Sequence, residues 1–288
     1  MGMRTIIMKV NTRRYMGELS IHVLLIIFCI YSILPILWVT VSSLKPESDL
    51  FQWPPRWLPK GLYLENFRLV LGQTDVTTTL VNSVIVSSIS ALTVMIAGAL
   101  GAYAIGRLRF RGRDLILLAI LATQMIPSLT NIVPIYLMLS KVRMIDTRTS
   151  LVLVYTGMNI PLSIWILIGF MQSIPRELEE AAMIDGCTRL SSFARVIIPL
   201  CLPGLAAVTI LTFVIAWNEF VMALVLISSK ELLTYQVGLY NFMLTQAGYF
   251  NQWAQLNAVA VLGLIPTFIG YLSVQKYFVA GLMRGAIK

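Results

Sequence analysis

Ionisable side chains are concentrated in one segment of this chain, residues 174–203, which reads IPRELEEAAMIDGCTRLSSFARVIIPLCLP. This charged segment holds 7 charged residues, out of 22 basic and 13 acidic residues in the whole chain, although long uncharged runs flank it. It is too short and too charged to cross a bilayer, which takes about 20 mostly apolar residues. Its apolar and charged residues are also too regularly arranged for a flexible linker. We therefore predict a docking element in the cytoplasm that moves the hydrophobic helices on either side of it.

The other residue types that could do chemistry predict neither catalysis nor metal binding. His22 is the single histidine, and the three cysteines, Cys29, Cys187 and Cys201, have no metal-ligand spacing. No G-x-x-x-x-G-K-[ST] sequence is present, so the chain has no phosphate cradle of that kind and is not expected to hydrolyse ATP. An enzyme inside the bilayer would need a paired nucleophile and base, or metal ligands. We predict no catalytic residue, no metal and no cofactor bound by this chain.

The composition predicts an integral membrane protein. Hydrophobic residues make up 58% of the 288 residues and charged residues 12%, whereas a soluble domain carries about 25% charged residues. That leaves too little polar surface to keep a globule of this size in water. The formal net charge is +9, but the basic residues cluster at the ends of apolar runs, where they set orientation in the membrane. Because no recognition motif accompanies the charge, nucleic acid is not an expected partner.

Six apolar runs, each long enough for a membrane-spanning helix, predict an all-α protein with six transmembrane helices. The spans are expected at about residues 20–43, 78–105, 115–139, 149–172, 204–227 and 253–275. Lys and Arg are more numerous on the side that holds both termini and the charged segment, so that side is expected to be cytoplasmic. The chain then consists of an amino-terminal segment, 1–18, a single membrane domain, 19–280, and a tail, 281–288.

The second span carries a face of small residues, with Gly98 and Gly101 among several alanines. Such faces let membrane helices approach closely. The sequence RLRFRGRD follows at residues 107–114, and its four arginines are a strong signal for the cytoplasmic side.

The charged segment is patterned as two short helices joined by a glycine corner. Pro175 suits the first turn of a helix, and the acids that follow favour the helix dipole. Gly186 would end this helix, and Thr188 would cap the second one. The expected apolar faces are Ile174, Leu178, Ala181 and Ala182 in the first helix and Leu190, Phe193, Ala194 and Ile197 in the second. The alternative is an amphipathic connector that lies on the membrane surface. Its acidic residues would then be repelled by the anionic lipids of the inner leaflet.

The spacing in this segment resembles the EAA loop of the membrane subunits of ATP-binding-cassette (ABC) importers that work with a solute-binding protein. Glu180-Ala181-Ala182 is followed, after three intervening residues, by Gly186 and then by an aliphatic residue and Pro199. Val196 and Ile198 stand where the family pattern has Ile and Leu, which are conservative departures. The resemblance implies a coupling helix seated in a cleft of a cytoplasmic ATPase. The implied coupling residues are Glu180, Ala181, Ala182, Asp185, Gly186, Arg189 and Pro199.

Motifs over nearly the whole chain resemble the carbohydrate-importing branch of this family, and most of all the second permease subunit of maltose-type importers. They are Ser42-Ser43-Leu44-Lys45-Pro46, Asn82-Ser83, Gly101-Ala102-Tyr103-Ala104, Ala216-Trp217-Asn218-Glu219 and residues 281–288. The resemblance implies a type I ABC importer permease fold in the bacterial cytoplasmic membrane, with both termini cytoplasmic. The implied function is to form half of the translocation path of an ATP-driven importer of a sugar, an oligosaccharide or a related carbohydrate.

The same resemblance implies the partners. They are a second permease subunit, expected to be a different chain, two ATPase subunits that hold ATP and Mg, and an extracytoplasmic solute-binding protein. The lipid bilayer is the remaining expected contact.

Glu219 is the only formally charged residue inside a predicted span. An acid at the centre of a bilayer costs about 2.5–3.5 kcal/mol on insertion scales, so Glu219 is not expected to face lipid. We predict that it lines the translocation path or pairs across a subunit boundary, with Asn218 beside it. A protonated acid in a helix contact is the alternative. Further candidates for the path are Asn82, Gln124, Asn131 and Asn257.

A secondary active transporter with no ATPase partner is the competing function. It would need coupling-ion sites, usually several intramembrane acids or broken half-helices in matching halves. The predicted spans hold one acid and show no symmetry, although prolines in four of the six spans leave broken helices possible. Co-purification of an ATPase subunit would distinguish the two functions.

Overall fold

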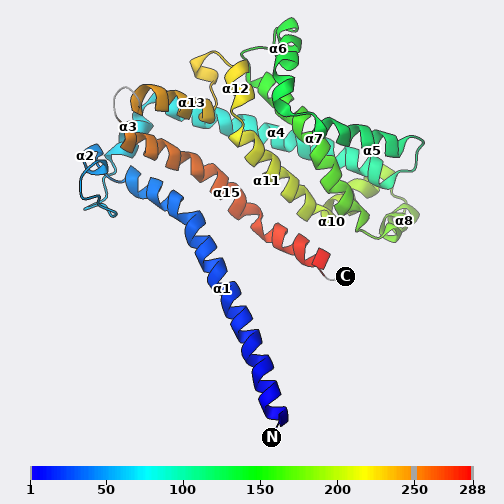
Figure 1. Ribbon diagram of the computed structural model, residues 1–288. Coiled ribbons are helices and arrows are strands. Elements are labelled where there is room, and N and C mark those ends of the chain that lie inside the picture. The colour runs from blue at the N-terminus through cyan, green and yellow to red at the C-terminus, as the bar shows by residue number, and fades with distance from the viewer. Residues whose placement is uncertain (1, 248–251, 287–288) are drawn as a thin grey trace. The chain divides into compact units, whose positions relative to one another are not determined.

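The computed structural model describes residues 2–247 and 252–286, and all of the regular secondary structure in these residues is helical (Figure 1). The predicted all-α architecture is therefore confirmed. Four of the described helices are long and apolar enough to cross a membrane, and two bent helix pairs raise the number to six if each pair is one span. The chain forms two compact units, Met1–Val70 with Gln246–Val261 and Leu71–Thr245 with Leu262–Lys288.

The first unit contains α1 (Gly2–Ser43), α2 (Glu47–Leu50), most of α3 (Glu65–Gly72) and the start of α15 (Trp253–Ala286). The apolar window of α1 within Glu18–Ser43 has none of its residues buried. A helix that is apolar on all sides and exposed on all sides suits contact with lipid or with another subunit.

Three polar side chains brace the irregular residues after α1. The buried Lys45 Nζ donates to the carbonyl oxygen of Arg56 at 2.6 Å, and Asn66 Nδ2 donates to the carbonyl oxygens of Ser43 and Lys45 at 2.8 Å each. The Glu47 carboxylate accepts the Trp253 and Ala254 backbone N–H groups at the start of α15, at 3.1 and 2.7 Å. Carboxylates are favourable at this position because the first N–H groups of a helix have no partner within it.

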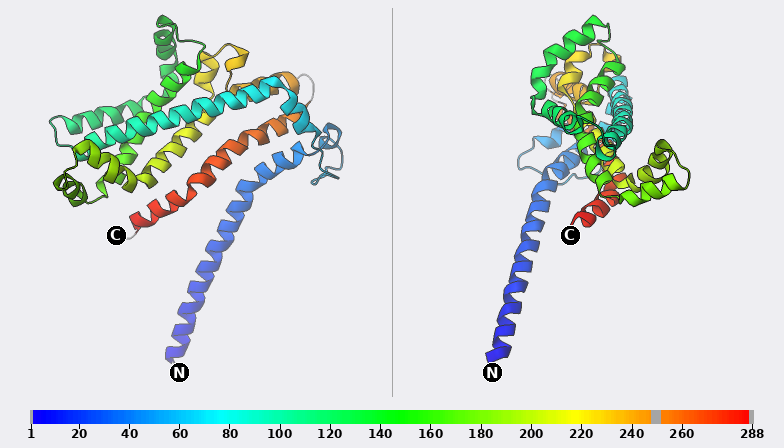
Figure 2. Two further views of the ribbon diagram at one scale, coloured as in Figure 1. Left: turned by 180° about the vertical axis from the view of Figure 1, so that it is seen from behind. Right: turned by 90° about the vertical axis from the view of Figure 1, so that its right-hand side faces the viewer.

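The second unit is built around α4 (Thr74–Arg107), which lies beside α7 (Arg148–Gln172) and α11 (Leu202–Asn218) (Figures 1 and 2). The small-residue face of α4 is where α7 packs. A Cβ atom added at Gly101 would lie 2.8 Å from Ile164 Cδ1, and one added at Gly98 would collide with the Ser163 side chain. The expected close approach is confirmed, because a larger residue at either glycine would collide with side chains of α7.

Shorter helices complete the second unit, except that the last of them, η5, crosses the boundary between the units after Thr245. They are α5 (Arg113–Ala122), η1 (Thr123–Met125), η2 (Ser128–Asn131), α6 (Ile132–Lys141), α8 (Arg176–Ile184), α9 (Arg189–Ser192), η3 (Phe193–Ile197), α10 (Ile198–Leu200), α12 (Val221–Leu226), η4 (Lys230–Leu232), α13 (Tyr235–Phe242) and η5 (Met243–Ala247).

Two of the predicted spans are interrupted. The segment expected at 115–139 bends by 92° between Arg113–Met125 and Ser128–Lys141. Ile126 is extended there (ψ 120°), because the ring of Pro127 disfavours a helical conformation in the residue before it. In the segment expected at 204–227, α11 ends at Asn218, Glu219 is extended (ψ 124°), and α12 begins at Val221.

We predict that Gly101→Leu destabilises the protein by about 1–3 kcal/mol, because the new side chain overpacks the α4–α7 contact. Gly169→Leu is the matched control, since no atom lies within 4 Å of a Cβ added at that helical glycine. The measurement is thermal unfolding of the purified proteins in detergent. Equal midpoints for the two variants would contradict close packing at Gly101.

Candidate functional site

The charged segment forms the predicted helix, corner and second helix. α8 begins after Pro175 and ends at Ile184, and Gly186 has φ +91°, a left-handed conformation that glycine adopts without a steric penalty. Thr188 Oγ1 accepts the Ser191 backbone N–H at 3.3 Å and so caps α9. Local residue chemistry therefore determines this part of the segment.

Three apolar side chains anchor the charged segment in the second unit. Ile174, Phe193 and Ile197 are buried in the core that α4 and α7 share. The Phe193 ring lies 4.6 Å, between centroids, from the ring of Tyr103 in α4. These are three of the eight residues expected on the two apolar faces.

A buried polar contact reinforces this anchor. Glu179 is 8% exposed, and its Oε1 accepts a hydrogen bond from Tyr103 Oη at 2.5 Å. Arg107, at the end of α4, donates through Nη2 to the carbonyl oxygens of Met171 and Ile174, at 2.5 and 2.6 Å. Sequence reasoning missed Glu179 and Arg107 as positioning residues.

The side chains left exposed on this segment make it suitable for docking. Leu178, Ala181 and Ile184 recur every three residues on α8, and Leu178 and Ile184 are 45% and 86% exposed. Leu190, on α9, is 69% exposed. Of the predicted coupling residues, Glu180, Ala181, Asp185, Gly186, Arg189 and Pro199 are exposed and Ala182 is half-buried. Exposed apolar side chains among charges are typical of a protein-binding surface.

Glu219 lies at the break between α11 and α12. Its Oε1 accepts the Met222 N–H at 2.9 Å, and its Oε2 accepts the Ala223 N–H at 3.1 Å and the Tyr155 hydroxyl at 2.9 Å. The carboxylate thus satisfies backbone N–H groups that the break leaves without helical partners. The neighbouring Asn218 is exposed and donates to Val214 O, within its own helix, at 2.8 Å.

Asn82 is also fully engaged in holding the fold. Its Nδ2 donates to the carbonyl oxygens of Glu231 and Leu233, at 2.8 and 2.9 Å, and its Oδ1 accepts from Arg148 Nε at 3.0 Å. The side chain is 1% exposed. It therefore ties α4 to α7 and to the chain around η4.

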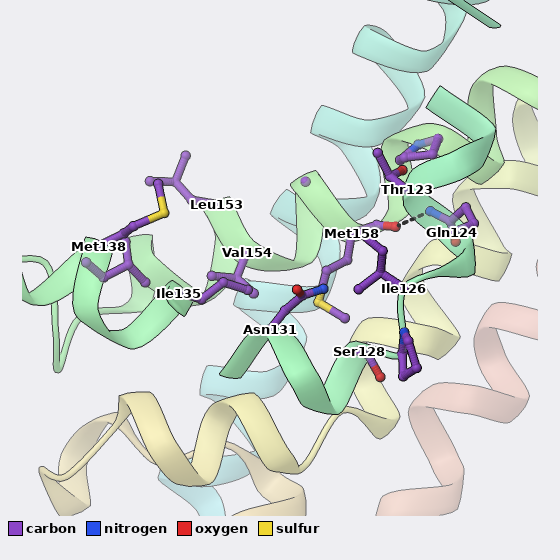
Figure 3. Close-up of a pocket in the computed structure, with 14 residues that line it drawn as sticks. Thr123, Gln124, Ile126, Ser128, Asn131, Ile135, Met138, Leu153, Val154 and Met158 are labelled. Atoms are coloured by element: carbon purple, nitrogen blue, oxygen red, sulfur yellow. Dashed lines mark hydrogen bonds between the residues drawn. The ribbon is translucent and has the colours of Figure 1, made fainter. Parts of the chain in front are cut away.

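An open pocket of about 600 Å³, which we call the bend pocket, lies at the bend between η1 and η2 (Figure 3). Four polar residues line it: Thr123, Gln124, Ser128 and Asn131. Apolar side chains from α6 and α7, among them Ile135 and Val154, form the rest of its wall. Among the predicted path residues, Gln124 and Asn131 lie here, whereas Asn82, Asn218 and Glu219 do not line the bend pocket.

Comparison with known proteins shows similarity over most of the chain. Residues 95–283 match the family described as "Binding-protein-dependent transport system inner membrane component". The chain is 35% identical over 262 residues to the sulfoquinovosyl glycerol transport system permease protein SmoH of Agrobacterium fabrum, covering 91% of each chain. It is 33% identical over 270 residues to the trehalose/maltose transport system permease protein MalG of Thermococcus litoralis, covering 92% of this chain and 94% of MalG.

The fold also matches a solved structure. One chain of a crystal structure of a bacterial ABC transporter involved in the import of the acidic polysaccharide alginate has a TM-score of 0.80 and 27% identity. The match covers 93% of this chain and 98% of that chain.

We predict that Tyr155 and Glu219 stabilise the α11–α12 break as one unit. Glu219→Gln replaces an acceptor oxygen with a donor that faces backbone N–H groups, and hydrogen bonds to charged groups contribute about 1.5–3 kcal/mol each. Glu219→Gln should therefore lower the unfolding midpoint, and Tyr155→Phe should add little in the double variant. A double-mutant cycle in thermal unfolding checks this, and strictly additive effects would contradict it.

Proposed function

Because this chain belongs to the binding-protein-dependent transport system inner membrane components, we propose that it is a membrane-spanning subunit of an ATP-driven sugar importer. It is a multi-pass inner membrane protein. The main support for this proposal is the similarity to SmoH and MalG over more than nine-tenths of the chain. The names of these relatives specify a sulfoquinovosyl glycerol and a trehalose/maltose transport system. These relatives support a carbohydrate as the transported substrate. The similarity to the alginate importer supports longer saccharides as well.

The charged segment is the proposed contact with a cytoplasmic ATPase. Buried residues hold it to α4 and α7, while Leu178, Ala181 and Ile184 stay exposed beside Glu180 and Asp185. ATP and Mg bind to the partner subunits in this proposal, and closure of two ATPases pushes two such segments together. The membrane helices then change from inward-facing to outward-facing, as a two-state element biased by nucleotide.

The remaining partners follow from the same family membership. A second permease subunit completes the path, and the exposed apolar surface of α1 supports contact with such a subunit or with lipid. An extracytoplasmic solute-binding protein delivers the sugar. The bias of Lys and Arg supports cytoplasmic termini and a cytoplasmic charged segment.

The bend pocket is the proposed stretch of the translocation path on this subunit. Its amide and hydroxyl groups suit the hydroxyl groups of a sugar, and its apolar wall suits the faces of sugar rings. Asn131 and Gln124 are the proposed contacts. Gln124 Nε2 donates to the Met158 carbonyl oxygen at 3.3 Å, so the contact proposed for Gln124 uses its Oε1. Asn82 and Glu219 contribute by holding the surrounding backbone rather than by touching the sugar, since their side chains are engaged within the fold.

The decisive experiment reconstitutes this chain in proteoliposomes with the second permease, the ATPase subunits and the binding protein. ATP-dependent uptake is then measured for a monosaccharide, a disaccharide and oligosaccharides. Uptake that needs no ATPase, or failure of any ATPase to co-purify, would favour a secondary transporter instead.

We predict that Glu180→Lys lowers ATP-dependent uptake by roughly tenfold or more, because it reverses a charge on the docking surface. Gly186→Asp should act in the same direction, since it places a side chain at the left-handed corner. Both variants should still insert into the membrane. Asp114→Lys is the control, because this acid is 97% exposed and lies outside the charged segment. Normal uptake and normal ATPase binding in both test variants would contradict the docking role.

We predict that Asn131→Leu and Gln124→Leu each lower sugar uptake by roughly threefold to tenfold, the effect of losing one polar contact of about 0.5–1.5 kcal/mol. Assembly with the ATPase should be unchanged. Asn218→Leu is the comparison, because Asn218 bonds within its own helix and does not line the bend pocket. Uptake lost in Asn218→Leu but retained in the other two variants would place the path elsewhere.

A further inference from the structure

A second cavity, of about 240 Å³, lies between the end of α4 and the α8–α9 corner. Four arginines and two acids line it: Arg107, Arg109, Arg176, Arg189, Glu179 and Glu180. We call it the arginine cavity. A water molecule occupies about 30 Å³ in the liquid, so the cavity has room for a group of several heavy atoms.

The arginine cavity carries an excess of positive charge. Four guanidinium groups face two carboxylates, and one of these, Glu179, is already bonded to the Tyr103 hydroxyl. Among the described residues, no ion pair within 4.0 Å joins any of the four arginines to Glu179 or Glu180. The lining of the cavity therefore carries more positive than negative formal charge.

Arg107 provides an independent sign of a missing acceptor. It is 7% exposed, and its Nη2 is bonded to two carbonyl oxygens of the α7 end. Its Nε is buried with no hydrogen-bond partner in the described residues. A buried donor without an acceptor is costly, as is a buried guanidinium without a counter-charge. An anion in the adjacent cavity would supply the missing counter-charge.

We propose that the arginine cavity binds a phosphate group, carried either by an anionic phospholipid or by a free phosphate. Planar guanidinium groups bind phosphate oxygens through two parallel hydrogen bonds, which makes arginine well suited to this anion. The cavity adjoins the carboxyl end of the apolar candidate span Asp75–Arg107.

A bound phosphate would join two parts of the second unit. Arg107 and Arg109 belong to the end of α4, and Arg176 and Arg189 begin α8 and α9. The anion would hold the α8–α9 corner to α4 and so limit its movement. This regulatory consequence rests on the proposed function, whereas the binding itself does not.

The test uses the full chain assembled with its partner subunits in detergent. The probes are inorganic phosphate, compared with chloride at equal ionic strength, and a short-chain phosphatidylglycerol, compared with short-chain phosphatidylcholine. We expect one or both probes to raise the unfolding midpoint above that of the matched chloride or phosphatidylcholine sample.

Arg109→Gln and Arg176→Gln should each weaken binding by roughly tenfold, the effect of one charge-assisted contact. Arg111→Gln is the matched control, an exposed arginine of the same loop that does not line the cavity.

Each outcome separates the possibilities. A shift with phosphatidylglycerol alone assigns the site to a lipid headgroup, a shift with inorganic phosphate alone assigns it to free phosphate, and a shift with both probes assigns it to phosphate in general. Midpoints equal to those in chloride and in phosphatidylcholine overturn the proposal, as does equal weakening in Arg111→Gln. Binding that persists without ATP-dependent uptake would refute the proposed function and leave this site intact.

Discussion

The contact of Tyr103 and Arg107 with the charged segment is the constraint on which the rest of the second unit depends. Tyr103 bonds the buried Glu179 of α8, and Arg107 bonds two carbonyl oxygens where α7 ends. All of these groups are buried, so moving α8 away from α4 would break charge-assisted bonds that water does not readily replace. α8 and the end of α4 are therefore expected to move together. The proposed coupling to an ATPase requires this property, because the segment would have to pass a displacement to the membrane helices.

Polar side chains elsewhere in the second unit compensate for irregular backbone. In a bilayer every backbone N–H and C=O needs a partner within the protein. Glu219 supplies acceptors at the start of α12, and Asn82 supplies donors to two carbonyl oxygens next to η4. Broken helices are thus possible here without exposing backbone groups to lipid. The bend at Pro127 differs, since polar side chains there line an open pocket.

The sequence predicted features that depend on local chemistry and the close approach at the small-residue face of α4, but it missed which polar side chains are buried. The α8 boundaries and the Gly186 corner follow from a proline, a glycine and a capping threonine within one segment. The burial of Glu179 rather than the adjacent Glu180 depends instead on a partner far away in the sequence. That partner is Tyr103, which is 76 residues away from Glu179. Proline content did not predict the bend either. Pro161 and Pro266 lie inside continuous helices, whereas the helix is broken at Pro127.

The cost of burying an acid does not by itself predict which groups Glu219 contacts. The cost predicts that Glu219 avoids lipid, but it is equally well offset by a transported sugar, another subunit or the backbone of a broken helix. The structure supplies three donors from Tyr155, Met222 and Ala223. Unused hydrogen-bonding capacity is a better guide to substrate contact than polarity, because engaged groups gain little from a ligand. By that criterion Asn131, which lines the bend pocket and has no side-chain hydrogen bond to other described residues, is the stronger candidate.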